Sequence, residues 1–326
     1  MTINIAFSSD NNYIPFLCTA VFSLLKNSDK KNIYHIYILD GGISIENQKK
    51  LQNSLKQFKN KKIFFIKINK NIFKNIKPIL QLNQTSYYRL LLPDILPKIS
   101  KIIYLDCDIL ILKNISKLYQ EKLGQKFIGC CPIFHPNYQK VLQKTYPNIP
   151  IKTAINAGVA LMNLKKLRIH NYSNTFINFI NKNSEKLLAG DQDVLNIVLS
   201  NKIKLIHPKW NSTSYIFVVK NNKKCNLSKK DFYTCKNDPS IIHFDGVKPW
   251  ATGSQHQYKK IFKKYLKQTE FKNYKTKFNF QNLIKNQIFY NGNKIANLLP
   301  NSIYNFIEKQ YLKNNFLEKK FKEISL

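Results

Sequence analysis

Arginine is nearly absent from this 326-residue sequence, although the chain is strongly basic. Lys and Arg together number 53 against 18 Asp and Glu, yet only Arg89 and Arg168 are arginines. The formal net charge of +35 favours an anionic partner, such as nucleic acid, anionic lipid or a phosphorylated substrate. Lys, Asn and Ile are abundant throughout, a pattern that a genome poor in G and C would produce, and we interpret most lysines as solvated surface charges. A lysine cannot supply the planar, bidentate donor of a guanidinium, so Arg89 is a candidate site residue.

Long apolar runs and paired cysteines are also missing. No run of 18 apolar residues occurs, so we expect no membrane-spanning helix. The first residues have no basic region ahead of an apolar stretch, and Asp10 interrupts that stretch, so we expect no export by a signal peptide. None of the six cysteines forms a CxxC pair, and Cys18, Cys107 and Cys130 lie in apolar context. This favours a reduced, cytosolic protein over a disulfide scaffold or a zinc site.

Hydrophobic residues make up 44% of the chain, enough to bury a substantial core in one large or two smaller domains. Their periodicity alternates between the period of a strand and that of a helix. Strands are predicted at residues 4–10, 32–42, 61–68, 102–112, 127–134 and from 155, and helices at 12–28, 44–58, 85–96, up to 168, and 190–200. The alternation predicts a layered α/β domain with a largely parallel sheet.

The stretch IIYLDCDILIL, residues 102–112, places two carboxylates inside an apolar run. If the strand continued, Asp106 and Asp108 would share one side with Cys107 opposite. If the strand ends there, both face the crevice at the carboxyl end of the sheet, where ligands of α/β proteins gather. Two such close carboxylates repel each other unless a cation lies between them, and hard oxygen ligands suit Mg²⁺ or Mn²⁺.

Five sequence blocks together resemble a known family. AFSSDNNYIPFL, IIYLDCDILIL, NAGVALMNLKKLR, GDQDVLN and HFDGVKPW occur in this order between residue 3 and about residue 250. They resemble the retaining glycosyltransferases of family 8, and above all the bacterial lipopolysaccharide galactosyl- and glucosyltransferases. The resemblance implies a GT-A nucleotide-diphospho-sugar transferase fold, in which a Rossmann-like mixed sheet is flanked by helices. It also implies a Mn²⁺ (or Mg²⁺) site and a UDP-sugar donor whose anomeric configuration is retained.

The resemblance also implies a role for each matching residue. The metal ligands would be Asp106, Asp108 and His243, with Cys107 between the two aspartates. The donor would be bound by Ser8, Asp10, Asn12 and Tyr13 at the uridine end, by Gly246 and Lys248 at the diphosphate, and by Asn156, Ala157, Asp191 and Gln192 at the sugar. Arg89 matches the family's donor-binding arginine. Turn formation or helix capping is an alternative role for Asp10 and Asn12, and Trp250 is expected to be a packing residue.

The expected catalytic residues are Asp191 and Gln192. In the family, Gln192 would lie near the anomeric carbon and has been discussed as the nucleophile. An amide is a poor nucleophile compared with a carboxylate, so front-face attack by the acceptor stays open as the alternative. Pro132 and Ile133 stand where close relatives often carry an aspartate, which leaves the acceptor open.

The amino-acid composition changes in the last part of the chain. We divide the sequence into a catalytic domain, residues 1–254, and a basic, aromatic C-terminal region, residues 255–326, expected to be helical. Lysines mixed with Phe, Tyr and Leu are typical of a peripheral membrane anchor; a nucleic-acid surface and a plain helical extension packed on the catalytic domain are the alternatives. Together with the resemblance, this predicts a cytoplasmic protein held on the anionic inner face of the bacterial cytoplasmic membrane.

The sequence therefore predicts a metal-dependent retaining glycosyltransferase. It would move galactose or glucose from UDP-galactose or UDP-glucose to a lipid-linked lipopolysaccharide or lipooligosaccharide core. A glycogenin-like or protein-acceptor glucosyltransferase is the alternative within the fold. A nucleic-acid-binding protein is suggested by the net charge alone and leaves the sequence blocks unexplained, so no nucleic acid partner is expected. The oligomeric state is left open.

Overall fold

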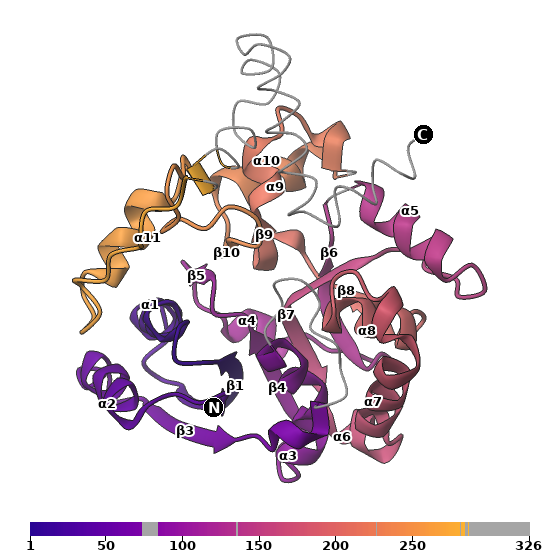
Figure 1. Ribbon diagram of the computed structural model, residues 1–326, viewed down its shortest axis with the longest axis horizontal. Helices are drawn as coiled ribbons and strands as arrows, with labels where there is room; N and C mark the ends of the chain where they lie inside the picture. The colour runs from indigo at the N-terminus through magenta and orange to yellow at the C-terminus, as the bar shows by residue number, and fades with distance from the viewer. Residues whose placement is uncertain (74–83, 135, 226, 281, 284–285, 287–326) are drawn as a thin grey trace.

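The computed structural model describes residues 1–73, 84–134, 136–225, 227–280, 282, 283 and 286. A seven-stranded mixed sheet forms its centre, with helices on both faces (Figure 1). In spatial order its strands are β3 (Lys61–Lys67), β2 (Ile33–Asp40), β1 (Thr2–Ser9), β4 (Lys101–Leu105), β7 (Ile155–Asn163), β6 (Ile128–Pro132) and β8 (Ile203–Leu205). The strands from β3 to β4 run parallel, whereas β7 is antiparallel to both β4 and β6. The predicted α/β fold with a mixed sheet is confirmed.

Two apolar clusters lie on opposite faces of this sheet. In β4, Ile103 and Leu105 belong to one cluster, and Ile102 and Tyr104 to the other. Neighbouring side chains of a strand point to opposite faces, so a strand buried on both faces needs an unbroken apolar run. This explains why residues 102–105 are uniformly apolar.

Helices cover both faces (Figure 1). The first face is covered by α1 (Ile14–Lys26), α2 (Ile45–Ser54) and α11 (Lys259–Leu266), and the second by α3 (Leu92–Ile95), α6 (Leu164–Ile169) and α7 (Tyr172–Asn183). The structure also contains α4 (Ser116–Gln120), α5 (Pro136–Thr145), α8 (Asp191–Val198), α9 (Ser214–Val218) and α10 (Lys229–Asn237). Ser44 caps α2 by accepting the Asn47 N–H at 3.3 Å.

Residues 102–112 do not form one strand. β4 ends at Leu105, and the following β5 (Ile109–Ile111) belongs to a second, three-stranded sheet with β10 (Ile241–His243) and β9 (Ser212–Thr213). The two aspartates therefore lie in the link between the sheets, so the interpretation that the strand ends there is correct. In the second sheet His243 pairs with Ile109, which brings His243 next to the aspartates.

The helix predicted at residues 85–96 differs in detail. A 3-10 helix, η2 (Gln84–Leu91), precedes α3, and Pro93 lies in the first turn of α3 rather than ending a helix. Proline is tolerated there because the first N–H groups of a helix have no partner within it.

The described part of the C-terminal region packs against the first face of the sheet. Phe262 of α11 is fully buried, and the Tyr265 hydroxyl accepts a hydrogen bond from Asn27 at the end of α1 at 2.8 Å. Trp250 stacks on Phe16 with ring centroids 3.5 Å apart, which confirms it as a packing residue. Residues 287–326, on which much of the membrane-association prediction falls, lie outside the described residues. Within the described part of the chain, no helix is long and apolar enough to cross a bilayer.

Candidate active site

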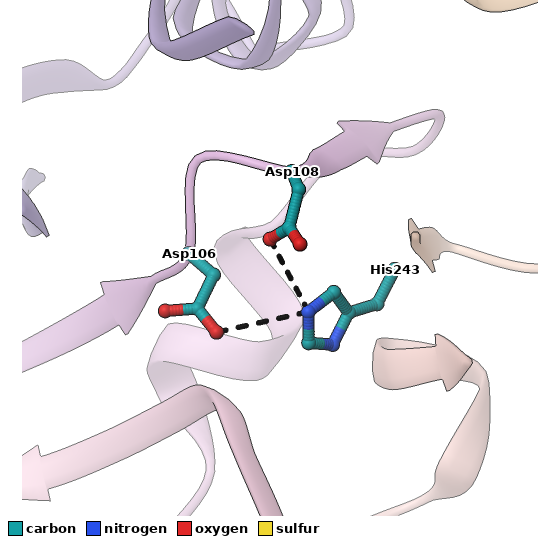
Figure 2. A group of neighbouring side chains, drawn as sticks. All are labelled: Asp106, Asp108 and His243. Carbon is teal, nitrogen blue, oxygen red and sulfur yellow. Dashed lines mark ion pairs between the residues drawn. The ribbon is translucent and has the colours of Figure 1, made fainter. Parts of the chain in front are cut away.

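Two aspartates and a histidine meet where the two sheets join. Asp106 and Asp108 come from the link after β4, and His243 from the end of β10 (Figure 2). His243 Nε2 lies 3.3 Å from Asp108 Oδ1 and 3.6 Å from Asp106 Oδ2. One ligand atom from each of the three residues lies within 4.8 Å of the others. The sequence-predicted metal ligands therefore converge on one point.

A partly buried cation, Lys248, partly neutralises this cluster. The Lys248 ammonium pairs with Asp108 and donates to the Phe244 carbonyl at 2.7 Å. Burial alone would raise the pKa of Asp108, but Lys248 and His243 lower the pKa below its usual range. Burial lowers the pKa of His243, and Asp108 more than offsets this and raises it. Asp108 therefore stays ionised, as a metal ligand must be.

The space around His243 depends on a glycine. A Cβ at Gly158 would lie 2.2 Å from His243 Cε1 and 2.8 Å from Asp106 Oδ2, so any larger residue would displace both side chains. Two carboxylates and one imidazole nitrogen form a donor set that suits Mn²⁺ or Mg²⁺ and leaves coordination positions for substrate oxygens. These residues fit a divalent cation.

Arg89 links the cluster of Asp106, Asp108 and His243 to the start of α8. Its side chain is 4% exposed and lies over the Tyr104 ring, with Cζ 4.1 Å from the centroid. It pairs with Asp106 at 2.6 Å and Asp191 at 2.7 Å, and donates to the Ala157 carbonyl at 2.7 Å. Burial lowers the pKa of Arg89, but Asp106 and Asp191 more than offset this, so the guanidinium stays charged.

Asp191 and Gln192 open α8. Gly190 is the N-cap of this helix, and its φ of 59° suits a glycine. Asp191 is the first helical residue. Burial raises the pKa of Asp191 to about 6, despite the opposing charge of Arg89. The Gln192 side-chain oxygen accepts the Ala157 N–H at 3.1 Å. This hydrogen bond connects α8 to the start of β7.

The residues expected at the uridine end surround the end of β1. Asp10 accepts the backbone N–H groups of Asn12 and Tyr13 at 2.9 and 3.0 Å, so it forms the turn that precedes α1. The turn-forming role considered for Asp10 is thus present. Tyr13 is 38% exposed and has its edge toward Trp250.

Two further predicted residues, Ser8 and Cys107, connect this turn to the link that carries Asp106 and Asp108. The Cys107 thiol donates to the Ser8 carbonyl at 3.1 Å, and the Ser8 hydroxyl donates to the Thr85 carbonyl. Burial raises the pKa of Cys107 well above its usual value, so the thiol stays protonated. Cys107 therefore holds the DCD link against β1, while the aspartates on either side turn toward His243.

Asn211 lies behind His243, and sequence reasoning did not single it out. It is the last residue of the 3-10 helix η4 (Pro208–Asn211), and its side-chain oxygen lies 3.0 Å from His243 Nδ1. No sequence signal marks Asn211, because its role depends on a contact across 32 residues of chain. Asn156, which was predicted to hold the sugar, accepts a hydrogen bond from the Asn211 amide at 2.8 Å.

Fold and site together define a class of protein. A mixed α/β sheet with an acidic link after a central strand, joined to a histidine on a second small sheet, is the GT-A architecture of nucleotide-sugar transferases. The solved galactosyltransferase LgtC, in complex with donor and acceptor sugar analogues, has this fold: it superposes with a TM-score of 0.73 at 23% identity, covering 82% of this chain and 96% of that one. The bifunctional glycosyltransferase WbbM superposes with a TM-score of 0.70 at 18% identity, covering 83% of this chain and 50% of that one.

Sequence comparison identifies the family. Residues 4–253 match the family model Glycosyl transferase family 8, and the chain belongs to this family of glycosyltransferases. General stress protein A of Bacillus subtilis is 28% identical over 274 residues, covering 82% of this chain and 94% of the relative. A putative glycosyltransferase of Haemophilus influenzae is 31% identical over 258 residues, with 78% and 75% covered. The lipopolysaccharide 1,2-glucosyltransferase of Escherichia coli is 24% identical over 262 residues, with 76% and 73% covered.

Proposed function

We propose that this enzyme is a metal-dependent, retaining hexosyltransferase. It moves galactose or glucose from UDP-galactose or UDP-glucose to a lipid-linked lipopolysaccharide or lipooligosaccharide core. The observation that carries the proposal is the convergence of Asp106, Asp108 and His243, with Lys248 and Arg89 on either side. The Escherichia coli relative is a lipopolysaccharide 1,2-glucosyltransferase and LgtC is a galactosyltransferase, which supports a hexose donor. The Escherichia coli relative also supports a lipopolysaccharide acceptor.

The diphosphate of the donor meets the positive side of the site. Asp106, Asp108 and His243 would hold Mn²⁺ or Mg²⁺, which when bound supplies charge next to the leaving diphosphate. Lys248, held in place by Asp108 and the Phe244 carbonyl, presents an ammonium to the same group. Gly246 has no side chain, so the backbone of this loop can approach the phosphates closely.

The uridine and the sugar lie on either side of the diphosphate in this proposal. The Ser8–Tyr13 turn presents the exposed Tyr13 ring, which can stack on the uracil. At the other end, Asp191 accepts a hydrogen bond from a sugar hydroxyl, while Arg89, Asn156 and Ala157 position the ring.

Front-face substitution agrees best with the contacts of Gln192. Its carbonyl oxygen accepts the Ala157 N–H, which draws electron density away from an already weak nucleophile. The acceptor hydroxyl then attacks from the face on which the diphosphate leaves, and its proton passes to the departing phosphate oxygen. The bond from the anomeric carbon to the diphosphate breaks as the bond to the acceptor oxygen forms, so the configuration is retained.

A peripheral position on an anionic membrane agrees with a lipid-linked acceptor. In residues 272–280, Phe278 and Phe280 are 73% and 64% exposed and follow the exposed Lys272, Lys275 and Lys277. Such a segment can bind lipid headgroups through lysines while its rings enter the interface. This supports a location on the inner face of the cytoplasmic membrane.

Donor turnover tests the proposal directly. We expect release of UDP from UDP-galactose or UDP-glucose with Mn²⁺, and its loss on addition of EDTA. Asp108→Ala should abolish turnover in a protein that still folds, because Asp108 is required for the cation. Asp238→Ala removes an exposed carboxylate that pairs with Lys113 far from the site, and is the matched control that should stay active. Turnover by Asp108→Ala at the wild-type rate, or turnover that EDTA leaves unchanged, would refute the metal-dependent assignment.

A further inference from the structure

Two buried asparagine side chains connect the backbone of β7 to His243. The Gly158 N–H donates to the Asn156 side-chain oxygen at 3.0 Å, and the Asn211 amide nitrogen donates to the same oxygen at 2.8 Å. The Asn211 oxygen lies 3.0 Å from His243 Nδ1. Asn156, Asn211 and His243 are all buried, so water does not compete for these groups.

The Gly158 N–H determines how the side chains of Asn156 and Asn211 are oriented. A backbone N–H can only donate, so the Asn156 atom that faces Gly158 is its oxygen. The Asn211 atom that faces this oxygen must then be the NH₂ group, which turns the Asn211 oxygen toward His243. An amide oxygen can only accept, so His243 Nδ1 carries a hydrogen and the lone pair of the neutral ring is on Nε2.

The far side of Asn156 agrees with this assignment. Its amide nitrogen lies 3.5 Å from Asp245 Oδ2, and a carboxylate only accepts. Asp245 in turn accepts the Ser214 N–H at 2.9 Å through its other oxygen. Both ends of the chain of hydrogen bonds therefore demand the same orientation of Asn156.

We propose that Asn211, oriented by Asn156, is a positioning residue that holds His243 in the tautomer and ring orientation needed for metal ligation through Nε2. Nε2 is the nitrogen that faces Asp106 and Asp108. Without Asn211, the two carboxylates would favour the tautomer with the hydrogen on Nε2. That nitrogen would then have no lone pair to offer a metal ion. Partners of this kind, one step removed from the ion, typically affect metal affinity about 10- to 100-fold. The inference rests on the proposed function for its metal, but the tautomer is a property of the chain alone.

The first test measures the tautomer without metal. In protein labelled with nitrogen-15 at histidine, at about pH 9, well above the usual pKa of an imidazole, long-range proton–nitrogen correlations show which ring nitrogen carries the hydrogen. The His243 signals are assigned by their loss in His243→Gln. We expect the hydrogen on Nδ1 in the wild-type protein and on Nε2 in Asn211→Leu. Asn211→Asp keeps an acceptor for Nδ1–H and should keep the wild-type tautomer. A hydrogen on Nε2 in the wild-type protein would overturn the proposal, whether or not any variant folds.

The second test measures Mn²⁺ affinity in the presence of UDP, from the electron paramagnetic resonance signal of free Mn²⁺. Asn211→Leu should bind Mn²⁺ about 10- to 100-fold more weakly. Asn32→Leu is the control, because Asn32 is also buried but lies ahead of β2, where it bonds Ser116. A loss of affinity in Asn211→Leu no greater than in Asn32→Leu would contradict the proposal. A wild-type protein that binds no Mn²⁺ would refute the proposed function instead, and the tautomer measurement would still decide the role of Asn211.

Discussion

At the scale of single residues, the contacts of the two arginines explain why a lysine would not serve at either position. Arg89 reaches Asp106, Asp191 and the Ala157 carbonyl. Arg168 donates to the backbone carbonyls of Pro93, Leu96 and Ile99. Each site needs several donors fixed in one plane, and the point charge of a lysine cannot contact all of these acceptors.

Arg89→Lys should reduce kcat for donor turnover by about 100-fold or more, a typical effect of removing one fixed electrostatic donor from an active site. The remaining ammonium would leave Asp106 or Asp191 unpaired. Steady-state kinetics with each UDP-sugar measure the effect. Arg168→Lys is the control, since it should lower the melting temperature and leave kcat unchanged. Equal kinetic effects of the two variants would contradict the assigned role of Arg89.

His256 makes stability depend on pH outside the active site. It is buried against Phe217 and Phe244, and burial lowers its pKa from 6.5 to about 4. A pKa lower in the folded than in the unfolded state means that the unfolded chain binds more protons as pH falls below 6.5. The stabilisation is complete above pH 6.5 and is lost between there and pH 4.

His256→Asn should remove this dependence. The wild-type free energy of unfolding should fall by about 2 kcal/mol from His256 alone between about pH 7.5 and 5. Asparagine can still accept the Tyr258 N–H that His256 Nδ1 accepts, but it does not titrate. Denaturant unfolding at both pH values gives the difference. If His256→Asn lost as much stability as the wild-type protein between these two pH values, the assignment would be contradicted.

At the scale of elements, the active site depends on very short ones. β5 and β10 have three residues each, yet their pairing places His243 beside the link that carries the aspartates. Such short strands are not stable alone, so they depend on the clusters behind them. α11 contributes to this support, because Phe262 lies between Phe244, directly after His243, and Trp250.

Phe262→Ala should destabilise the protein by about 3 to 5 kcal/mol, the usual cost of removing a buried phenylalanine ring. Thermal or denaturant unfolding measures this loss. Ile261→Ala, one residue earlier on the same helix and 38% exposed, should cost less than about 1 kcal/mol. If both variants were equally stable, α11 would not be part of the folded core.

At the scale of the whole molecule, the charge of +35 is spread over a surface rich in lysine. Exposed lysines gain about 1 kcal/mol each near an anionic membrane. The exposed rings of Phe278 and Phe280 add an apolar contribution that salt does not screen.

The full chain should therefore bind vesicles of phosphatidylglycerol and not vesicles of phosphatidylcholine, and cosedimentation measures both. Replacing Phe278 and Phe280 by serine should weaken vesicle binding. The binding that this variant retains should be more sensitive to salt than that of the wild-type protein. Tyr233→Ser is the control, because Tyr233 is 50% exposed on α10. Binding to both vesicle types with equal strength would contradict an electrostatic membrane surface.

Sequence patterns predicted much of the fold. Alternating periods located β1, α1, β2, α2 and β3. The patterns did not show that residues 102–112 divide between two sheets, since apolar runs look alike in one long strand and in two short ones. The 3-10 geometry around Arg89 was missed for a related reason, because its hydrophobic spacing resembles that of an α-helix.

The sequence by itself determined the alternating α/β architecture, the family and the residues that carry charge, since these depend on local periods and on short blocks of particular residue types. Only the tertiary structure decided how those residues meet. The separation of β4 from β5 turns Asp106 and Asp108 toward His243, Gly158 makes room for the ring, and Asn211 contacts the ring from behind. These contacts join segments that are 32 or more residues apart, and no local pattern records a contact that forms only when distant backbones pack together.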